Sequence, residues 1–407
     1  MSTLPTSTLA LPPDELAAWL RLALTPGVGN HTARRLLARF GSPQHIFTQS
    51  AAALQTCASA AQATQLLQWP PHWETALATA TRWLEAGDAD TGHALIPLGD
   101  PRYPPALLQT EDPPLMLYAV GPAAWLQQPV PLVERGSALA IVGSRNPTAQ
   151  GSENARSFAQ ALAQQGWCVV SGMALGVDAA AHAGALQPAP DRLPPTVRPR
   201  TVAVVGTGVD RIYPRSNQAL AHAIVRQGFI LSEYPLGTPP IAANFPQRNR
   251  IIAGLSAGTL VVEAAVASGS LITARLAAEQ GREVFAIPGS IHAPQSKGCH
   301  ALLRQGAKLV EAVQDILEEL PPPAHTRAEH PATQVPVAQD APPTPPSALP
   351  TEHPVLHALG FDPMDLDQLQ ARTGWPTPAL QAWLLEQELD GQVARLPGGQ
   401  FQRLVRG

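Results

Sequence analysis

Six short apolar runs alternate with amphipathic segments between residues 138 and 310, and this alternation restricts the possible fold more than any other feature of the chain. The runs lie at 138–143, 167–172, 201–206, 228–233, 259–264 and 283–289. The intervening segments predict helices at 152–165, 174–186, 216–227, 247–255, 270–280 and 299–306. Apolar strands that alternate with helices are typical of a parallel sheet buried on both faces. The pattern therefore predicts an α/β, Rossmann-like, doubly wound domain with a mostly parallel sheet at 138–320.

The first 137 residues predict two further regions. Residues 1–94 predict a helical domain, because apolar residues recur with helical spacing in DELAAWLRLAL and again in HTARRLLARF. The loop Pro26-Gly27-Val28-Gly29 separates these helices and resembles that of a helix-hairpin-helix (SAM-like) domain. Such a loop can offer backbone N–H groups to a phosphate, and a tight structural turn is the alternative. Residues 95–137 are rich in proline and predict an extended connector with little regular structure.

Two proline-rich segments divide the rest of the chain. Five prolines at 187–200 predict a surface loop, and eleven prolines at 321–354 predict a disordered linker. Residues 355–407 predict a winged-helix domain, because three helical segments precede a hairpin with a Pro-Gly-Gly turn. This module holds four basic and six acidic residues, so we expect it to recruit a protein or modulate the central domain rather than anchor DNA.

The cysteines and the apolar segments indicate the compartment. Cys57, Cys168 and Cys299 are far apart and form no C-x-x-C pattern, which argues against a zinc site and suits a reducing environment. The first residues lack a basic stretch followed by a long apolar run, and no segment reaches about 18 uninterrupted apolar residues. We therefore expect a cytoplasmic protein without membrane contact.

The charges are unevenly distributed along the chain. Residues 138–310 contain 15 lysines and arginines against 8 aspartates and glutamates, whereas the remaining residues contain 12 against 23. A basic region between acidic flanks is typical of a site for a polyanion, and ordinary scatter of charge is the alternative.

The segments that follow the predicted strands carry the candidate binding residues. In an open parallel sheet the ligand binds outside the carboxyl ends of the strands, where loops lead into helix N-termini. Small residues let the backbone approach a phosphate there, and arginines add fixed positive charge. Glycines that serve only strand-to-helix turns are the alternative. The candidates are Ser144, Arg145, Gly206, Thr207, Gly208, Arg215, Arg248, Asn249, Arg250, Ser268, Gly269, Ser270, Lys297 and Gly298.

Other ligands and chemistries find weaker support in the sequence. The segment 206–208 reads G-x-G but lacks the third glycine of a dinucleotide fingerprint, and no G-x-x-x-x-G-K-[ST] or H-E-x-x-H motif is present. His182 lies on an alanine-rich helix and is expected to be a packed histidine rather than a base. We therefore predict no cofactor, no metal and no catalytic residue.

Several of these segments closely resemble the DNA-processing protein A (DprA/Smf) family. They are IVGSRNPTAQG, VVSGMALGVDAAAHAGAL, TVAVVGTGVDRIYPRSN, ILSEYPLG, FPQRNRIIAGLSAGTLVVEA, SGSLITARLAAEQGREVFAIPG and SKGCHALLRQGAKLV, and they cover about 140 to 310. The stretch YPPALLQTEDPPLMLYAVG is similar to the family's connector, and 355–407 is similar to its winged helix.

This resemblance implies a cytoplasmic homodimer without established catalytic activity. It implies that the protein binds and protects incoming single-stranded DNA and helps to load the RecA recombinase during natural transformation. Arg145 matches the family's single-strand-binding arginine, and the segments at 206–208, 248–250 and 268–270 match its phosphate-facing pocket. Arg215 stands where many members have lysine, so a cation is retained.

A related Rossmann-like group, the phosphoribohydrolases that resemble lysine decarboxylases, provides the rival enzymatic interpretation. These proteins use P-G-G-x-G-T followed by a glutamate. The comparable stretch here is 255–259 with Glu263 behind it, and the double glycine after proline is missing.

Overall fold

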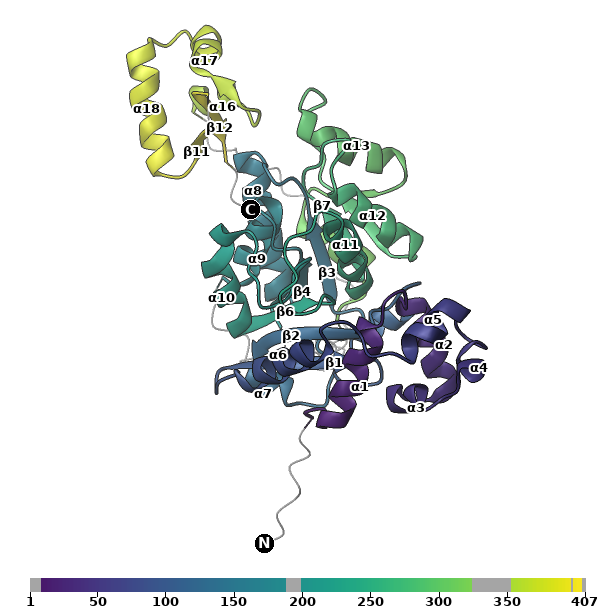
Figure 1. The fold of residues 1–407 in the computed structure, drawn as a ribbon. Coiled ribbons are helices and arrows are strands. Elements are labelled where there is room, and N and C mark those ends of the chain that lie inside the picture. The colour runs from purple at the N-terminus through teal and green to yellow at the C-terminus, as the bar shows by residue number, and fades with distance from the viewer. Residues whose placement is uncertain (1–8, 188–198, 324–352, 397, 405–407) are drawn as a thin grey trace, which may run out of the picture.

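The computed structural model describes residues 9–187, 199–323, 353–396 and 398–404. The proline-rich segments expected to form a loop at 187–200 and a disordered linker at 321–354 lie almost entirely outside the described residues. The described chain forms a helical N-terminal lobe, a central α/β domain and a C-terminal module (Figure 1).

A nine-stranded sheet forms the centre of the molecule, in the order β1-β2-β6-β5-β4-β3-β7-β8-β9. Its bounds are β1 Thr91–Pro97, β2 Met116–Pro122, β3 Ala138–Val142, β4 Cys168–Ser171, β5 Thr201–Val204, β6 Gly228–Ser232, β7 Gly258–Val261, β8 Glu283–Ala286 and β9 Lys308–Leu309. Strands β3 to β9 pair in parallel, whereas β2 pairs antiparallel with both β1 and β6. All six predicted strands are present, and the predicted α/β fold class is confirmed.

Helices cover both faces of this sheet (Figure 1). On one face lie α11 (Asn244–Leu255), α12 (Ser270–Glu279) and α13 (Lys297–Arg304), and on the other lie α8 (Ala149–Gln164), α9 (Val177–Ala185), α10 (Gln218–Gln227) and α14 (Val313–Glu319). Each of the six predicted helices has its counterpart among these.

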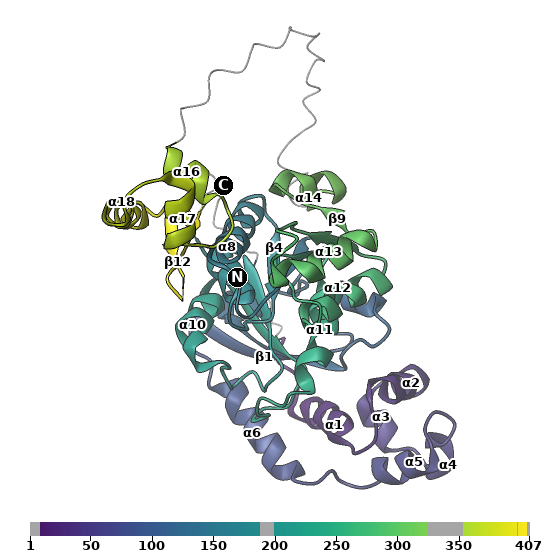
Figure 2. The same ribbon diagram turned by 90° about the horizontal axis from the view of Figure 1, so that it is seen from above.

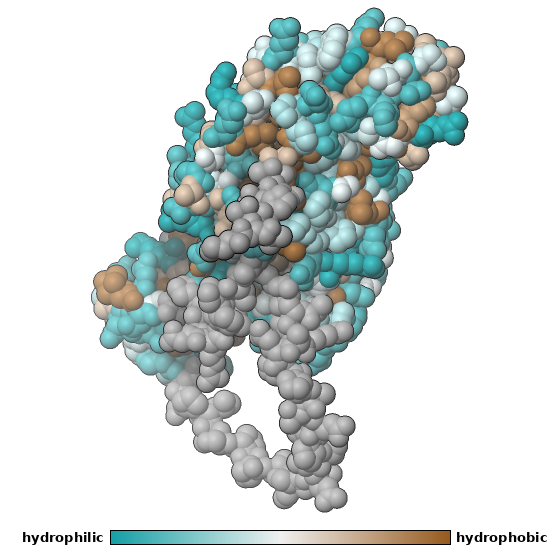
Figure 3. Space-filling view, turned by 90° about the horizontal axis from the view of Figure 1, so that it is seen from below, coloured by the Kyte–Doolittle hydropathy of each residue, from teal (hydrophilic) through white to brown (hydrophobic). Residues whose placement is uncertain are grey.

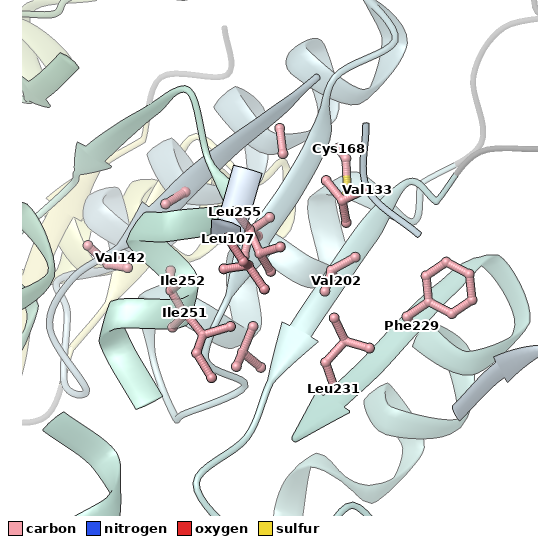
Figure 4. Close-up of a cluster of buried hydrophobic side chains, with 14 of the residues drawn as sticks. Leu107, Val133, Val142, Cys168, Val202, Phe229, Leu231, Ile251, Ile252 and Leu255 are labelled. Atoms are coloured by element: carbon pink, nitrogen blue, oxygen red, sulfur yellow. The ribbon is translucent and has the colours of Figure 1, made fainter. Parts of the chain in front are cut away.

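Strand β3 shows how the apolar runs are used. Ala138, Ala140 and Val142 pack under α11 and α12, whereas Leu139 and Ile141 pack under α8 and α9. Because successive side chains of a strand point to opposite faces, an uninterrupted apolar run supplies two cores at once. Figure 4 shows one of them, in which the α11 side chains lie over residues of several strands.

The proline-rich connector differs from the expectation of little regular structure. It contains β2 and the last three residues of β1, with the short helices η1 (Pro105–Gln109) and α7 (Ala123–Leu126) between and after them. Pro97, Pro104, Pro105 and Pro122 lie at the ends of these elements, where a missing N–H group costs little. The connector therefore widens the central sheet by two antiparallel strands.

The N-terminal lobe consists of short helices. They are α1 (Pro13–Leu24), α2 (Asn30–Phe40), α3 (Pro43–Phe47), α4 (Ala51–Leu54), α5 (Ala60–Leu66) and α6 (Trp73–Glu85). The two predicted helices correspond to α1 and α2, and the glycine-containing loop between them packs Val28 into the core of the lobe. Leu16 and Trp19 of α1 pack instead against the sheet domain, which joins the lobe to the rest of the molecule.

The C-terminal module has the predicted winged-helix order. Its elements are α16 (Pro354–Leu359), β10 (Met364–Asp365), α17 (Leu366–Thr373), α18 (Thr377–Leu389), β11 (Val393–Arg395) and β12 (Gln400–Arg403). The buried side chain of Gln402 accepts a hydrogen bond from the Gln150 backbone N–H at 3.3 Å and donates one to the Phe361 carbonyl at 2.8 Å. Strand β12 thereby docks on the first turn of α8 (Figure 2).

Candidate nucleic-acid interface

The strand order reverses next to β3. The chain proceeds from β3 outward through β4, β5 and β6, and then crosses to β7 on the other side of β3. The loops after β3 and β7 therefore diverge at their carboxyl ends and leave a crevice, which is where ligands of open α/β sheets bind.

A pocket of about 800 Å³ occupies this position. Residues 142–146 after β3 and residues 265–270 after β7 form two of its walls, and α11 forms a third. Of the predicted residues, the pocket brings together Ser144, Arg145, Arg248, Asn249, Ser268, Gly269 and Ser270.

A cation and two aromatic rings lie side by side in the lining of this pocket. The exposed Arg145 places its guanidinium carbon 5.8 Å from the centre of the Phe245 ring, within the range of a cation–π contact. The Tyr213 ring centre lies 5.7 Å from that of Phe245, and Tyr213 is 48% exposed. The wall can thus offer one positive charge and aromatic surface to a ligand.

Phe245 and Tyr213 were not among the predicted residues, although both lie in or beside the predicted binding segments. The sequence did contain a usable signal, since Phe245 and Tyr213 each lie within three residues of an arginine, and aromatic side chains near basic ones are typical of single-strand recognition. Only the fold shows that residues 32 positions apart meet in one wall.

Arg248 lies in the floor of the pocket and is almost fully buried. It is 4% exposed, and its Nη1 donates to the carbonyl of Gly172 at 2.7 Å and to that of Val204. Burial lowers its pKa, opposed mainly by the buried carboxylate of Asp178. Burial in turn raises the pKa of Asp178, opposed first by Arg248. Arg248 therefore closes the carboxyl ends of β4 and β5, and its charge faces that of Asp178.

The start of α12 provides polar groups on the opposite wall. Ser268 and Ser270 hold their hydroxyl oxygens 2.6 Å apart, and the Ser270 N–H donates to Ser268 Oγ at 3.3 Å. Asn249 Nδ2 donates to the Gly269 carbonyl at 3.3 Å and so ties α11 to this loop. The positive end of the α12 dipole adds to the charge of Arg145.

The predicted segment Gly206-Thr207-Gly208 is buried and does not line the pocket. The Gly208 N–H donates to the Thr238 carbonyl at 3.0 Å, and Thr207 Oγ1 donates to the Arg211 carbonyl at 2.9 Å. A side chain at Gly206 would lie 3.2 Å from the Phe245 ring. This segment therefore supports Phe245 from behind, and its glycines are required by packing.

Arg250 points away from the pocket toward the N-terminal lobe. Its guanidinium contacts the carboxylate of Glu233 and the carbonyl of Asp112. Helix α11 begins at Asn244, three residues earlier than predicted, and it contains Arg248 and Arg250, as the predicted helix at 247–255 also does. Residues two positions apart on a helix point about 200° apart, so the pair cannot face one ligand.

The other predicted cations also lie outside the pocket lining. Arg215 is exposed at the start of the 3-10 helix η2 (Arg215–Asn217), two residues after Tyr213. Lys297 is exposed and donates to the Ile291 carbonyl. A side chain at Gly298 would lie 2.5 Å from the Ala264 carbonyl, so this glycine serves the packing of α13 against the loop after β7.

The glutamate of the rival enzymatic interpretation has a structural contact. The Glu263 carboxylate accepts hydrogen bonds from the Thr148 N–H at 2.9 Å and the Thr148 hydroxyl at 2.6 Å, at the N-terminus of α8. Gly258 and Thr259 of the compared stretch lie inside β7 rather than in a loop. Within the described residues, no group of three or more histidine, cysteine or acidic side chains is arranged to hold a metal ion.

No helix among the described residues has the length and apolar character needed to cross a membrane.

Family models match three parts of the chain. Residues 94–321 match the model described as DNA recombination-mediator protein A, 13–65 match the DprA-like N-terminal HHH domain, and 339–399 match the DprA winged helix domain. The first match unites the connector and the α/β domain, as the sheet itself does.

Individual relatives give the same result. The chain is 39% identical to protein Smf of Escherichia coli over 95% of its own length and 96% of that protein. It is 41% identical to DNA processing protein DprA of Bacillus subtilis, over 57% of this chain and 73% of that one. The crystal structure of DprA from Streptococcus pneumoniae superposes with a TM-score of 0.59 and 33% identity, covering 76% of this chain and 99% of the other. The protein therefore belongs to the DprA/Smf family of DNA-processing proteins.

Proposed function

We propose that the pocket between the loops after β3 and β7 binds single-stranded DNA with little sequence preference. The observation that carries this proposal is the exposed Arg145 beside the rings of Phe245 and Tyr213. A strand offers phosphates to a cation and unpaired bases to aromatic faces, whereas the bases of a duplex remain stacked on one another.

The remaining groups of the pocket support the same ligand. The start of α12 and the hydroxyls of Ser268 and Ser270 favour an anion. None of these groups distinguishes one base from another, because phosphate and aromatic stacking are common to every sequence. Binding rather than chemistry on the DNA is therefore the activity that we assign.

We further propose that the protein acts as a homodimer in the cytoplasm, protecting incoming single strands and helping to load the RecA recombinase in natural transformation. Membership of the DprA/Smf family supports this role. The acidic winged-helix module, docked through Gln402, is suited to a protein partner more than to phosphate.

Binding titrations with labelled single-stranded and double-stranded oligonucleotides at several salt concentrations test the proposal. We expect tighter binding of the single strand, and an affinity that falls steeply as salt rises, because bound phosphates release counterions. Equal affinity for duplex, or a flat salt response, would refute the proposed function.

Replacing Arg145 with alanine is expected to weaken single-strand binding by about 1–3 kcal/mol. The slope of log affinity against log salt should become shallower by about 0.7, the value for one phosphate contact with a single strand. Arg226→Ala, at an exposed position of α10, is the matched control and should bind as the wild type does. Normal binding by Arg145→Ala, with an unchanged melting temperature, would remove Arg145 from the site.

Replacing Phe245 with alanine is expected to cost about 1–3 kcal/mol of single-strand affinity through lost stacking. Its salt slope should stay that of the wild type, since no charge is removed, and Phe245→Trp should retain the affinity. A shallower slope for Phe245→Ala would show instead that the ring acts by positioning Arg145.

A further inference from the structure

The N-terminal lobe has an unusual charge distribution for a chain with net charge −4. Between Glu15 and Glu74 the sequence contains four arginines and no aspartate or glutamate. Helices α2, α3, α4 and α5 all lie inside this interval, so these four helices have no acidic side chain of their own. Figures 1 and 2 show the lobe protruding from the sheet domain, at the opposite end of the molecule from the winged-helix module, and Figure 3 shows the surface of the molecule from below.

The arginines of α2 are divided between two faces. Arg34 donates to the Glu111 carbonyl at 2.8 Å and lies 4.0 Å from the Asp112 carboxylate. His31, Arg35 and Arg39 are exposed and recur every four residues, on the face opposite the buried Ala33 and Leu36. Neither Arg35 nor Arg39 has a hydrogen bond or ion pair to any residue that the structure describes.

The lobe is fixed to the helix that lines the central pocket. Asp112 accepts a hydrogen bond from Asn30 of α2 at 3.2 Å and lies 3.6 Å from Arg250 of α11. Arg250 is in turn paired with the buried Glu233. The opposite face of α11 carries Phe245, so one helix connects the pocket to the Asn30 and Arg34 side of α2. Because α11 has 12 residues, it spans only about 18 Å.

We propose that His31, Arg35 and Arg39 form a second contact for the phosphate backbone of a single strand whose bases occupy the central pocket. An acid-free surface with unpaired guanidinium groups favours a polyanion, and its fixed distance from the pocket favours a continuous strand over a separate ligand. This inference rests on the proposed function, and it predicts a binding site longer than the pocket alone provides.

The test compares a short oligonucleotide of about 6 nucleotides with a long one of about 20, since single-strand sites commonly take about 4–16 nucleotides per domain. The double variant Arg35→Gln/Arg39→Gln of the full chain should bind the short strand as the wild type does. Its affinity for the long strand should fall about tenfold, and the salt slope for that strand should become shallower by about 1.4, the value for two phosphate contacts.

Two control variants make this result specific. Arg35→Lys/Arg39→Lys keeps the charges and should retain the salt slope. Arg82→Gln/Arg226→Gln removes the same net charge from exposed positions of α6 and α10 and should bind both strands normally. If the α2 variant binds the long strand normally, or the control variant weakens it equally, the second contact is refuted and the proposed function stands. If the wild type binds neither strand, the proposed function itself fails.

Discussion

Replacing Arg248 with alanine is expected to lower the free energy of unfolding of the central domain by about 3–5 kcal/mol. The substitution leaves the carbonyls of Gly172 and Val204 without their donor and removes the cation that faces the buried Asp178. It also opens a cavity, because the guanidinium fills the space beside Gly172 so closely that even an added Cβ atom there would collide with it. The shift of the urea midpoint, followed by circular dichroism, measures the loss.

Arg248→Met separates the polar contribution from the packing contribution, because methionine fills part of the space and donates no hydrogen bond. It should recover part of the stability and remain well below the wild type. Asn249→Ala, at the next position of α11, should change the midpoint little, because Asn249 donates only one long hydrogen bond. If Arg248→Ala keeps the wild-type midpoint and loses only DNA affinity, Arg248 is a strand contact, as the sequence predicts.

Lowering the pH from 7 to 5 is expected to remove about 2 kcal/mol of stability through His182. Thr201 Oγ1 donates to the Val169 carbonyl, so it accepts from His182 Nδ1–H at 2.7 Å. This leaves Nε2 as the site for a second proton, and Nε2 is buried without a hydrogen-bond partner in the described structure. Burial, and then the charge of Arg248, lower the pKa of His182 to about 3.

The direction of this effect follows from the lowered pKa. An unfolded chain binds the proton near pH 6.5, whereas the folded chain resists it down to about pH 3. The stability that neutral His182 contributes is therefore fully present above pH 6.5 and is lost as the pH falls from about 6.5 toward 3. His182→Asn keeps a donor for Thr201 and cannot titrate, so its stability should decrease less between pH 7 and 5. Parallel pH profiles for the two proteins would contradict the assignment.

The sequence alone determined the α/β domain and part of the lining of its candidate binding pocket. Apolar strands and helices alternate in 138–310 because both faces of a parallel sheet are covered, and this local pattern needs no knowledge of long-range contacts. The strand ends then placed Arg145 and the 268–270 loop at the same edge of the sheet, since all parallel strands point the same way. The position of Arg145 in the pocket lining could therefore be predicted from the sequence.

The tertiary structure decided which candidates face the pocket and which support it. Arg248 and Arg250 look equivalent in the sequence, yet the packing of α11 turns Arg248 into the floor of the pocket and Arg250 toward Glu233. Tyr213 and Phe245 become one wall only because two distant loops fold together. The prolines of the connector argue against strands there, yet β2 forms by pairing with β6, and β1 forms by pairing with β2. Such properties depend on neighbours brought together from elsewhere in the chain, and a local pattern cannot specify them.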